Sequence, residues 1–369
     1  MDAKAYWVGF NLVKGIGAVR LRGLLHHFGS LDLAWQAPAS ALEAAGLSAR
    51  LVQNLMEIRK QVHLDVLMER IARQGIQVIT WEDEIYPRRL REIDQPPPVL
   101  YVRGSIDPED DWAVAIVGTR RVTSYGRQVT ADLATFLAGN GITVVSGLAR
   151  GVDAMAHEAA LQAGGRTIAV LGSGVDRIYP PEHRRLADQI MNQGAVCSDY
   201  PVGTAPESTN FPPRNRIISG LSQATVVIEA GETSGALITA RFAADQGRDV
   251  FAVPGPINAV QSKGANSLIQ QGARPLLRIE EILEVLNLQH IQTQQKARKA
   301  LPADEIEAAL LKVIGQQPVH VDDIQAMSGL SIEKVSATLT LLELKGIVRQ
   351  VGGMNYVAVR ESPAAYWTD

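Results

Sequence analysis

The sequence of 369 residues predicts an α/β protein whose core is a doubly wound, mainly parallel sheet. Between residues 113 and 288, short runs of apolar and often β-branched residues alternate with helix-like patterns. Such runs are typical of parallel strands that helices cover on both faces. Several of the runs end in a turn of glycine and small polar residues, where the chain passes to a helix. The predicted strands are 114–117, 143–146, 167–171, 195–198, 224–229 and 250–253.

The composition is that of a globular protein with two or three domains. Hydrophobic residues make up 46% of the chain, charged residues 20%, and the net charge is −3. The protein as a whole is therefore no polycation, and any nucleic-acid site must be a local patch. Its one cysteine, Cys197, lies in an apolar run, which excludes an internal disulfide and indicates a reducing compartment. Because no apolar run is long enough to span a bilayer, we expect a cytoplasmic protein with no membrane partner.

Residues 1–65 are predicted to form a helical domain of the helix-hairpin-helix (SAM-like) type. Apolar residues at helical spacing flank a turn at Gly15 and Gly17, which would let backbone amides approach a phosphate. A second, degenerate unit is expected over residues 39–58, with a break at Gly46. Phosphate binding and purely structural packing both stay open for this domain.

The core domain is predicted over residues 66–288, and its first part should extend the sheet. Residues 76–80 alternate in polarity as a strand does, and residues 100–102 indicate another strand. Prolines divide the segment between them into short extended pieces. The acidic, turn-rich residues 107–111 come just before the first parallel strand.

Glycine and other small residues at the ends of the first predicted parallel strands indicate that the ligand is an anion. Gly118 and Arg120 follow strand 114–117, Ser146 and Gly147 close the next strand, and a Gly-Ser-Gly turn follows the third. Turns of this kind direct backbone N–H groups toward the start of a helix, where anions bind. We therefore expect a polyanion along this edge of the sheet.

The segment that begins at Phe211 with the sequence Phe-Pro-Pro-Arg-Asn-Arg adds cations at the start of a helix. Its prolines suit a first turn, which would then contain Arg214, Asn215 and Arg216. Cations there oppose the helix dipole, so we expect Arg214 and Arg216 to neutralise a bound phosphate. Phe211 is a candidate for stacking on a base, and anchoring its loop in the core fits it equally well.

No enzyme motif is evident in the chain. There is no P-loop and no Gly-x-Ser-x-Gly elbow, and Arg177 stands where a dinucleotide fingerprint needs its third glycine. His157 and His183 lack partners at metal-ligand spacing. Asp153 pairs with His157 at i, i+4, and Glu229 ends a strand, but a cap and an ordinary polar pair explain the first two. We expect no catalytic residue, no metal and no cofactor.

Six motifs of the core occur in an order that one protein family shows. They are Gly118-Thr119-Arg120 with Tyr125-Gly126, Ser146-Gly147-Leu148-Ala149-x-Gly151-x-Asp153 with His157, Tyr179-Pro180, Phe211-Pro212-x-Arg214-Asn215-Arg216, Ser234-Gly235-x-Leu237-x-Thr239-Ala240 and Pro254-Gly255. On these motifs the chain resembles the DNA-processing protein A family (DprA, also called Smf) over essentially its whole core.

The resemblance implies an extended Rossmann-like domain that binds single-stranded DNA and forms a homodimer through the core. It further implies a non-enzymatic mediator that protects incoming DNA and helps to load the RecA recombinase during natural transformation. Some family members place a lysine shortly before the Phe-Pro pair, where this chain has Glu207. The DNA-pocket residues carried over by motif are Gly118, Arg120, Ser146, Gly147, Phe211, Arg214, Asn215 and Arg216.

Residues 289–300 are polar and are predicted to be a linker, followed by a winged helix over residues 301–360. The last region contains seven acidic and five basic residues, whereas a duplex reader needs a basic face. We therefore favour a protein-contact or accessory module, with duplex recognition as the alternative. The predicted elements are helices 304–314, 321–327 and 331–344 and a hairpin of strands 347–351 and 356–359.

A second class of function stays open for the core. A nucleotide-processing hydrolase of the phosphoribohydrolase kind could use Glu229 on a similar sheet. Such enzymes carry a Pro-Gly-Gly-x-Gly-Thr run before the helix, whereas residues 230–235 read Ala-Gly-Glu-Thr-Ser-Gly here. A purely structural partner protein fits poorly with so many turns suited to anions.

Overall fold

The computed structural model describes residues 2–286, 306, 309–310, 313–314, 318–344, 348–351 and 353–358. The chain divides into two compact units, residues 1–286 and 287–369, and each is described here by itself. The predicted linker, residues 289–300, lies outside the described residues.

Unit 1 is built on a nine-stranded sheet with the strand order β1-β2-β6-β5-β4-β3-β7-β8-β9. All neighbours from β6 to β9 pair in parallel, which confirms the predicted α/β class with a mainly parallel sheet. The strands are β1 (Gln77–Thr80), β2 (Val99–Gly104), β3 (Ala113–Val117), β4 (Thr143–Ser146), β5 (Thr167–Val170), β6 (Ala195–Ser198), β7 (Ala224–Val227), β8 (Asp249–Ala252) and β9 (Arg274–Pro275).

Strands β1 and β2 extend the parallel sheet at one edge, as predicted from residues 76–80 and 100–102. Strand β2 pairs antiparallel with both β1 and β6. A capping box at Asp107 and Asp110 then turns the chain through a short 3-10 helix, Pro108–Asp111, into β3. The carboxylate of Asp110 lies 2.8 Å from the guanidinium of Arg166, which ties this turn to the start of β5.

Helices cover both faces of the parallel strands, which explains why those strands are apolar throughout. Ile168 and Val170 pack with α11 and α12 on one face, whereas Ala169 and Leu171 pack with α9 and α10 on the other. The alternation follows from the two-residue period of a strand. The helices are α7 (Arg88–Arg91), α8 (Ser124–Gly139), α9 (Val152–Gln162), α10 (Arg184–Gln193), α11 (Phe211–Gly220), α12 (Gly235–Asp245), α13 (Lys263–Gln270) and α14 (Glu281–Val285).

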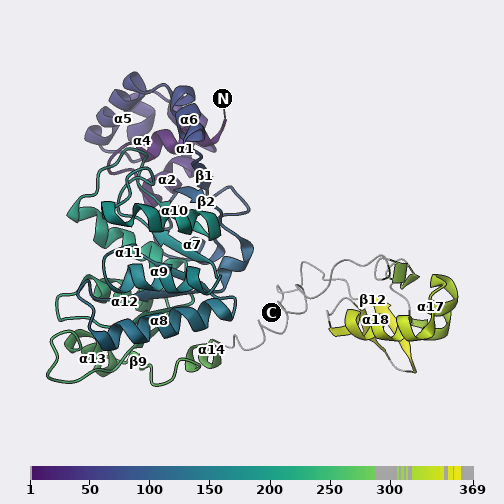
Figure 1. Ribbon diagram of the computed structural model, residues 1–369. Coiled ribbons are helices and arrows are strands. Elements are labelled where there is room, and N and C mark those ends of the chain that lie inside the picture. The colour runs from purple at the N-terminus through teal and green to yellow at the C-terminus, as the bar shows by residue number, and fades with distance from the viewer. Residues whose placement is uncertain are drawn as a thin grey trace. The chain divides into compact units, whose positions relative to one another are not determined.

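Six helices at the amino terminus gather at one end of unit 1 (Figure 1). Their apolar core includes Trp7 and Phe10 and continues onto Val99 and Tyr101 of β2, so the helices share a core with the antiparallel edge. The predicted domain boundary near residue 65 stays a prediction. The helices are α1 (Lys4–Asn11), α2 (Ala18–Phe28), α3 (Leu31–Gln36), α4 (Ala39–Ala44), α5 (Ala49–Gln61) and α6 (Leu64–Arg73).

The described part of unit 2 contains a helix pair and a small sheet ordered β10-β12-β11. Ile324 of α17 and Val335 and Leu339 of α18 are buried in one apolar cluster. This arrangement agrees with the predicted winged helix, while most of its first helix, 304–314, lies outside the described residues. The elements are β10 (Val319–His320), α17 (Val321–Ser328), α18 (Ile332–Leu344), β11 (Val348–Gln350) and β12 (Asn355–Ala358).

Candidate nucleic-acid interface

A cavity of about 710 Å³ opens at the carboxyl ends of β3 and β7. The chain runs outward from β3 through β4 and β5 to β6 on one side, and from β7 to β9 on the other. Ligands of open α/β sheets bind where the strand order reverses in this way. The cavity is lined by the turn after β3, the turn after β7, and the starts of α11 and α12.

The turn after β3 is held rigidly at the edge of the cavity. The backbone N–H of Thr119 donates to the carbonyl oxygen of Glu229 over 2.7 Å, and the N–H of Val152 donates to the carbonyl of Thr119 over 3.2 Å. A Cβ atom on Gly118 would lie 2.6 Å from Cγ2 of Val152. Only glycine fits this close approach, which fixes the direction in which Arg120 leaves the sheet.

Arg120 and Arg121 supply positive charge at the mouth of the cavity. Both side chains are exposed and line the cavity. Within residues 2–286, no hydrogen bond or ion pair engages either guanidinium group, so both are available to an anion. The sequence singled out Arg120, and the structure adds Arg121 beside it.

Arg214 lies beneath this mouth and is 5% exposed. Its Nη1 atom donates to the carbonyl oxygens of Gly147, over 2.9 Å, and Val170, and its Nε donates to Oδ1 of Asn215 over 3.2 Å. Burial lowers the pKa of the guanidinium to about 10, while the nearby carboxyl group of Asp153 opposes that shift. Carbonyl oxygens at the ends of β4 and β5 thus hold a cation that the helix dipole alone would disfavour.

Asp153 is the counter-charge to Arg214 on the floor of the cavity. Burial raises the pKa of its carboxyl group, and Arg214 and two backbone N–H groups act in the opposite direction. The N–H groups of Gly147 and Ala149 donate to Oδ2 of Asp153 over 3.2 and 3.3 Å. The Asp153 carboxylate thus holds the turn after β4 against the first turn of α9 and provides a buried counter-charge to Arg214.

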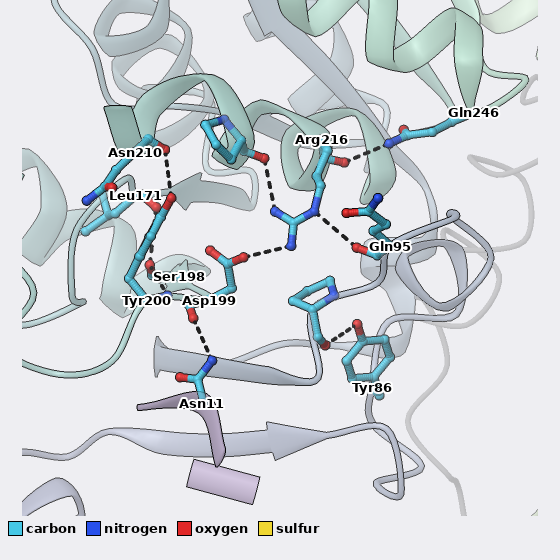
Figure 2. A network of polar contacts seen from close by, with 12 residues as sticks. Asn11, Tyr86, Gln95, Leu171, Ser198, Asp199, Tyr200, Asn210, Arg216 and Gln246 are labelled. Atoms are coloured by element: carbon cyan, nitrogen blue, oxygen red, sulfur yellow. Dashed lines mark hydrogen bonds and ion pairs between the residues drawn. The ribbon is translucent and has the colours of Figure 1, made fainter. Parts of the chain in front are cut away.

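The guanidinium of Arg216 lies outside the cavity, in a polar network beside β6 (Figure 2). Its Nη2 atom lies 2.8 Å from Oδ2 of Asp199, and Nε donates to the carbonyl of Gln95 over 3.1 Å. Nη1 donates to the carbonyl of Pro213 over 3.0 Å. These contacts tie α11 to the segment before β2, and the predicted DNA contact of Arg216 stays a prediction.

The remaining predicted residues divide between the cavity and its support. Gly118 and Asn215 line the cavity, and Gly147 lines a smaller one beside it. Ser146 is fully buried, and its hydroxyl donates to the carbonyl of Ile116 over 2.6 Å, which joins β4 to β3. Of the eight predicted residues, the structure therefore brings six to the two cavities: Gly118, Arg120, Gly147, Phe211, Arg214 and Asn215.

Phe211 and Tyr179 form an aromatic wall shared by the two cavities. Their ring centroids are 5.7 Å apart, with 36° between the ring planes. A Cβ atom on Gly172 would lie 2.8 Å from the Phe211 ring, and the Arg214 guanidinium lies 5.8 Å from that ring's centroid. Phe211 is thus packed against the protein, while the Tyr179 side chain is 37% exposed.

Several residues that line the large cavity are not among the eight predicted DNA-pocket residues. Tyr179 reaches it from the loop after β5, and Thr233, Ser234 and Gly235 reach it from the start of α12, where Ser234 caps the N–H of Ala236 over 3.3 Å. The sequence carried a signal for both, because a Tyr-Pro pair and a Thr-Ser-Gly turn each follow a predicted strand.

The geometry of Glu229 does not favour the hydrolase alternative. This carboxylate is 3% exposed and accepts hydrogen bonds from the backbone N–H of Thr123, over 3.0 Å, and from the Thr123 hydroxyl. It anchors the start of α8 and does not line the large cavity. A carboxylate engaged in this way is not presented to a substrate.

Two features are absent from the part of the chain that the structure describes. No helix among residues 2–286 or in the described part of unit 2 is long and apolar enough to cross a membrane. The same residues contain no cluster of His, Cys, Asp and Glu side chains arranged to hold a metal ion.

Comparisons of sequence identify relatives of this chain. A family model described as DNA recombination-mediator protein A matches residues 77–287, and a DprA winged helix domain model matches residues 294–354. Protein Smf of Synechocystis sp. is 38% identical over 390 aligned residues, which cover 96% of this chain and 98% of that protein. DNA processing protein DprA of Bacillus subtilis is 43% identical over 220 residues, which cover 59% of this chain and 74% of that protein.

Two solved structures are similar to this one. The X-ray structure of DNA processing protein A from Streptococcus pneumoniae has a TM-score of 0.67 and 34% sequence identity, covering 77% of this chain and 97% of that one. DNA processing protein A from Helicobacter pylori, whose structure was described for its single-stranded DNA binding mode, has a TM-score of 0.51 and 33% identity. That match covers 57% of this chain and 96% of the other.

Proposed function

The chain belongs to the DNA recombination-mediator protein A family, and from this premise we propose that it binds single-stranded DNA in the cavity at the ends of β3 and β7. The observation that carries the proposal is one cavity with two exposed arginines at its mouth, which have no partner in the described part of unit 1, and a buried arginine at its floor. The DprA of Helicobacter pylori, which was described for binding single-stranded DNA, supports the same ligand.

The charges of the cavity suit a phosphate backbone. Arg120 and Arg121 are exposed, and their guanidinium groups have no partner within residues 2–286. The turn that carries them is held to the end of β7 and the start of α9. A guanidinium group matches phosphate oxygens through two parallel N–H donors. Because the turn is already rigid, little conformational freedom is lost when a phosphate binds.

The aromatic wall suits unpaired bases. Every base has a flat face that can stack on an aromatic ring, and stacking is indifferent to sequence. In a duplex those faces are occupied by neighbouring base pairs. Tyr179 and Phe211 beside Arg120 therefore favour a single strand over a duplex, and favour no particular sequence.

We extend the proposal to the cellular role that the family implies. The protein would act without catalysis in the cytoplasm, protect incoming single strands, form a homodimer through its core and help to load the RecA recombinase during natural transformation.

Light scattering would test the dimer. A strand-exchange assay with RecA and a competing single-strand binding protein would test loading, with stimulation by this protein as the expected result.

A fluorescence-anisotropy titration tests the binding itself. The full chain is titrated against labelled single-stranded and double-stranded oligonucleotides at several salt concentrations, with the Arg120→Ala/Arg121→Ala variant alongside. We expect tighter binding of the single strand, and a salt slope smaller by about 0.7 for each phosphate contact that the variant loses. Arg73→Ala, at an exposed arginine of α6, is the matched control. Equal binding by the wild type and the double variant would refute the site.

A further inference from the structure

A smaller cavity of about 20 Å³ adjoins the large one behind the aromatic wall. Arg120, Arg150 and Arg214 all line it, together with Gly147 and Tyr179. A space of this size admits one water-sized group, since a single water needs about 10–15 Å³. With three arginines among its lining residues, this space suits a single oxygen of an anion.

The buried Arg214 has a donor left over for this space. Its Nε and Nη1 atoms are engaged by Asn215, Gly147 and Val170, whereas Nη2 has no acceptor within residues 2–286. Arg214 lines both the large cavity and the smaller one. A Cβ atom on Gly147 would lie 2.8 Å from Nη2, so glycine leaves this donor uncovered.

Arg150 differs from the other two arginines because its guanidinium group already forms an ion pair with a carboxylate. Its Nε and Nη2 atoms both lie 2.6 Å from Oε1 of Glu182, which belongs to the short 3-10 helix Pro181–His183. Both side chains are about half exposed. The pair joins the turn after β4 to the loop after β5, next to Tyr179.

We propose that the smaller cavity is a phosphate subsite of the single strand, and that Arg150 leaves Glu182 to bind that phosphate with Arg120 and Arg214. The inference rests on the proposed function, because it assigns one phosphate of the bound strand to this place. One non-bridging oxygen enters the small cavity, while the sugar and base stay in the large one. The carboxylate of Glu182 is then a built-in competitor of the phosphate.

The exchange is feasible because an exposed ion pair contributes little. Solvent and salt screen such a pair. It therefore stabilises the protein much less than a charge-assisted contact with two donors stabilises a bound phosphate. Breaking the Arg150–Glu182 ion pair therefore requires less free energy than the contact of Arg150 with the phosphate releases. Because the ion pair must still be broken, its presence weakens the binding of DNA. The subsite predicts that removing the carboxylate tightens binding.

Four variants of the full chain test the subsite by anisotropy with labelled oligo(dT). Glu182→Gln should tighten binding about two- to fivefold, the range that an exposed ion pair spans. Arg150→Gln should weaken binding and reduce the salt slope by about 0.7, the value for one phosphate of a single strand. In the double variant, Glu182→Gln should have no further effect. Glu69→Gln removes a carboxylate from another exposed ion pair, on α6 and 2.9 Å from Arg73, and should leave binding unchanged.

Several results would overturn the subsite. These are unchanged or weaker binding by Glu182→Gln, wild-type affinity and salt slope in Arg150→Gln, or the same tightening by Glu182→Gln when Arg150 is absent. Tightening by the Glu69→Gln control to the same extent would show a general charge effect and would equally refute the proposal. All three substituted side chains are exposed, so thermal unfolding of the four variants should match the wild type.

A second arm separates this inference from the proposed function. Thymidine 3′,5′-bisphosphate is titrated into the same proteins by calorimetry at low salt. If the wild type fails to bind oligonucleotides but the bisphosphate binds and follows the Glu182 and Arg150 pattern, the subsite stands and the single-strand proposal falls. If oligonucleotides bind but both probes ignore these two residues, the subsite falls and the single-strand proposal stands. Absence of binding in both arms refutes both.

Discussion

The Arg216 guanidinium lies 2.8 Å from the Asp199 carboxylate, and each side chain is at least four-fifths buried. The same guanidinium donates to the carbonyls of Gln95 and Pro213 (Figure 2). Arg216 thus links α11 to β6 and to the segment before β2, and its predicted contact with DNA stays a prediction.

Arg216→Ala should therefore act on stability. Removing one partner leaves a largely buried Asp199 uncompensated, so the free energy of unfolding should fall by about 2–4 kcal/mol, somewhat below the cost for a fully enclosed pair. Urea denaturation measures the change. Asp199→Asn in the Arg216→Ala background should recover part of the loss. An undiminished stability together with weaker DNA binding would instead support direct contact of Arg216 with DNA.

Tyr179→Ala should weaken binding of single-stranded DNA by the amount of one stacked base. Stacking on an aromatic ring is worth about 1–3 kcal/mol per base, or roughly 5- to 150-fold in affinity. Tyr179→Phe keeps the ring and should bind as the wild type does. An oligonucleotide with abasic sites keeps the phosphates but has no base to stack there, so Tyr179→Ala should leave its affinity unchanged. Equal losses with both oligonucleotides would mean that Tyr179 only supports the loop.

Gly118→Ala should destabilise the protein and weaken DNA binding together. The new methyl group would lie 2.6 Å from Cγ2 of Val152, and such overpacking costs about 1–3 kcal/mol. The displaced turn would also move Arg120. Val152→Ala removes Cγ2, so the double variant should be less destabilised than the sum of the two single variants. Additive losses in thermal or urea unfolding would exclude this clash as the cause.

Stability should fall as the pH drops from about 6.5 to 5 because of His157. Its Nδ1 atom lies 2.6 Å from the hydroxyl of Thr167, which itself donates to the carbonyl of Val144. Nδ1 must therefore carry the proton, and Nε2 is enclosed without a partner. Burial lowers the pKa of His157 to about 3. The ring is thus neutral in the folded protein.

The sign of this effect follows from the lowered pKa. The unfolded chain takes up a proton at this histidine below about pH 6.5, whereas the folded protein does not, so unfolding becomes easier as the pH falls. The loss should reach roughly 2 kcal/mol at pH 5 relative to pH 7.5. His157→Asn should flatten the dependence in urea unfolding at the two pH values. An equally steep dependence in that variant would assign it to other groups.

Much of the fold follows from local patterns in the sequence. Apolar runs predict the parallel strands because helices cover both faces, and alternation over residues 76–80 predicts β1. The positions of Gly118 and Arg120 at the cavity could also be predicted from the sequence, because a glycine turn after a buried strand lies at the ligand-binding edge of such a sheet.

The different placements of Arg214 and Arg216 needed the tertiary structure. Side chains two residues apart on a helix leave its axis about 200° apart, so Arg214 and Arg216 start in different directions. The spacing alone excludes a shared direction but does not say which of them faces inward. That choice depends on how α11 is rotated against β5 and β6, which bring the carbonyl of Val170 to one arginine and the carboxylate of Asp199 to the other.

By itself, the sequence determined the class of the sheet, the order of its strands along the chain and the turns at which an anion could bind, because these depend on residues close together in the chain. Only the tertiary structure decided which arginines are free, which are buried and which are paired. It also placed Tyr179 against Phe211 and Glu182 against Arg150. Such contacts join segments about 30 residues apart, and their geometry depends on the packing of whole elements, which no local pattern encodes.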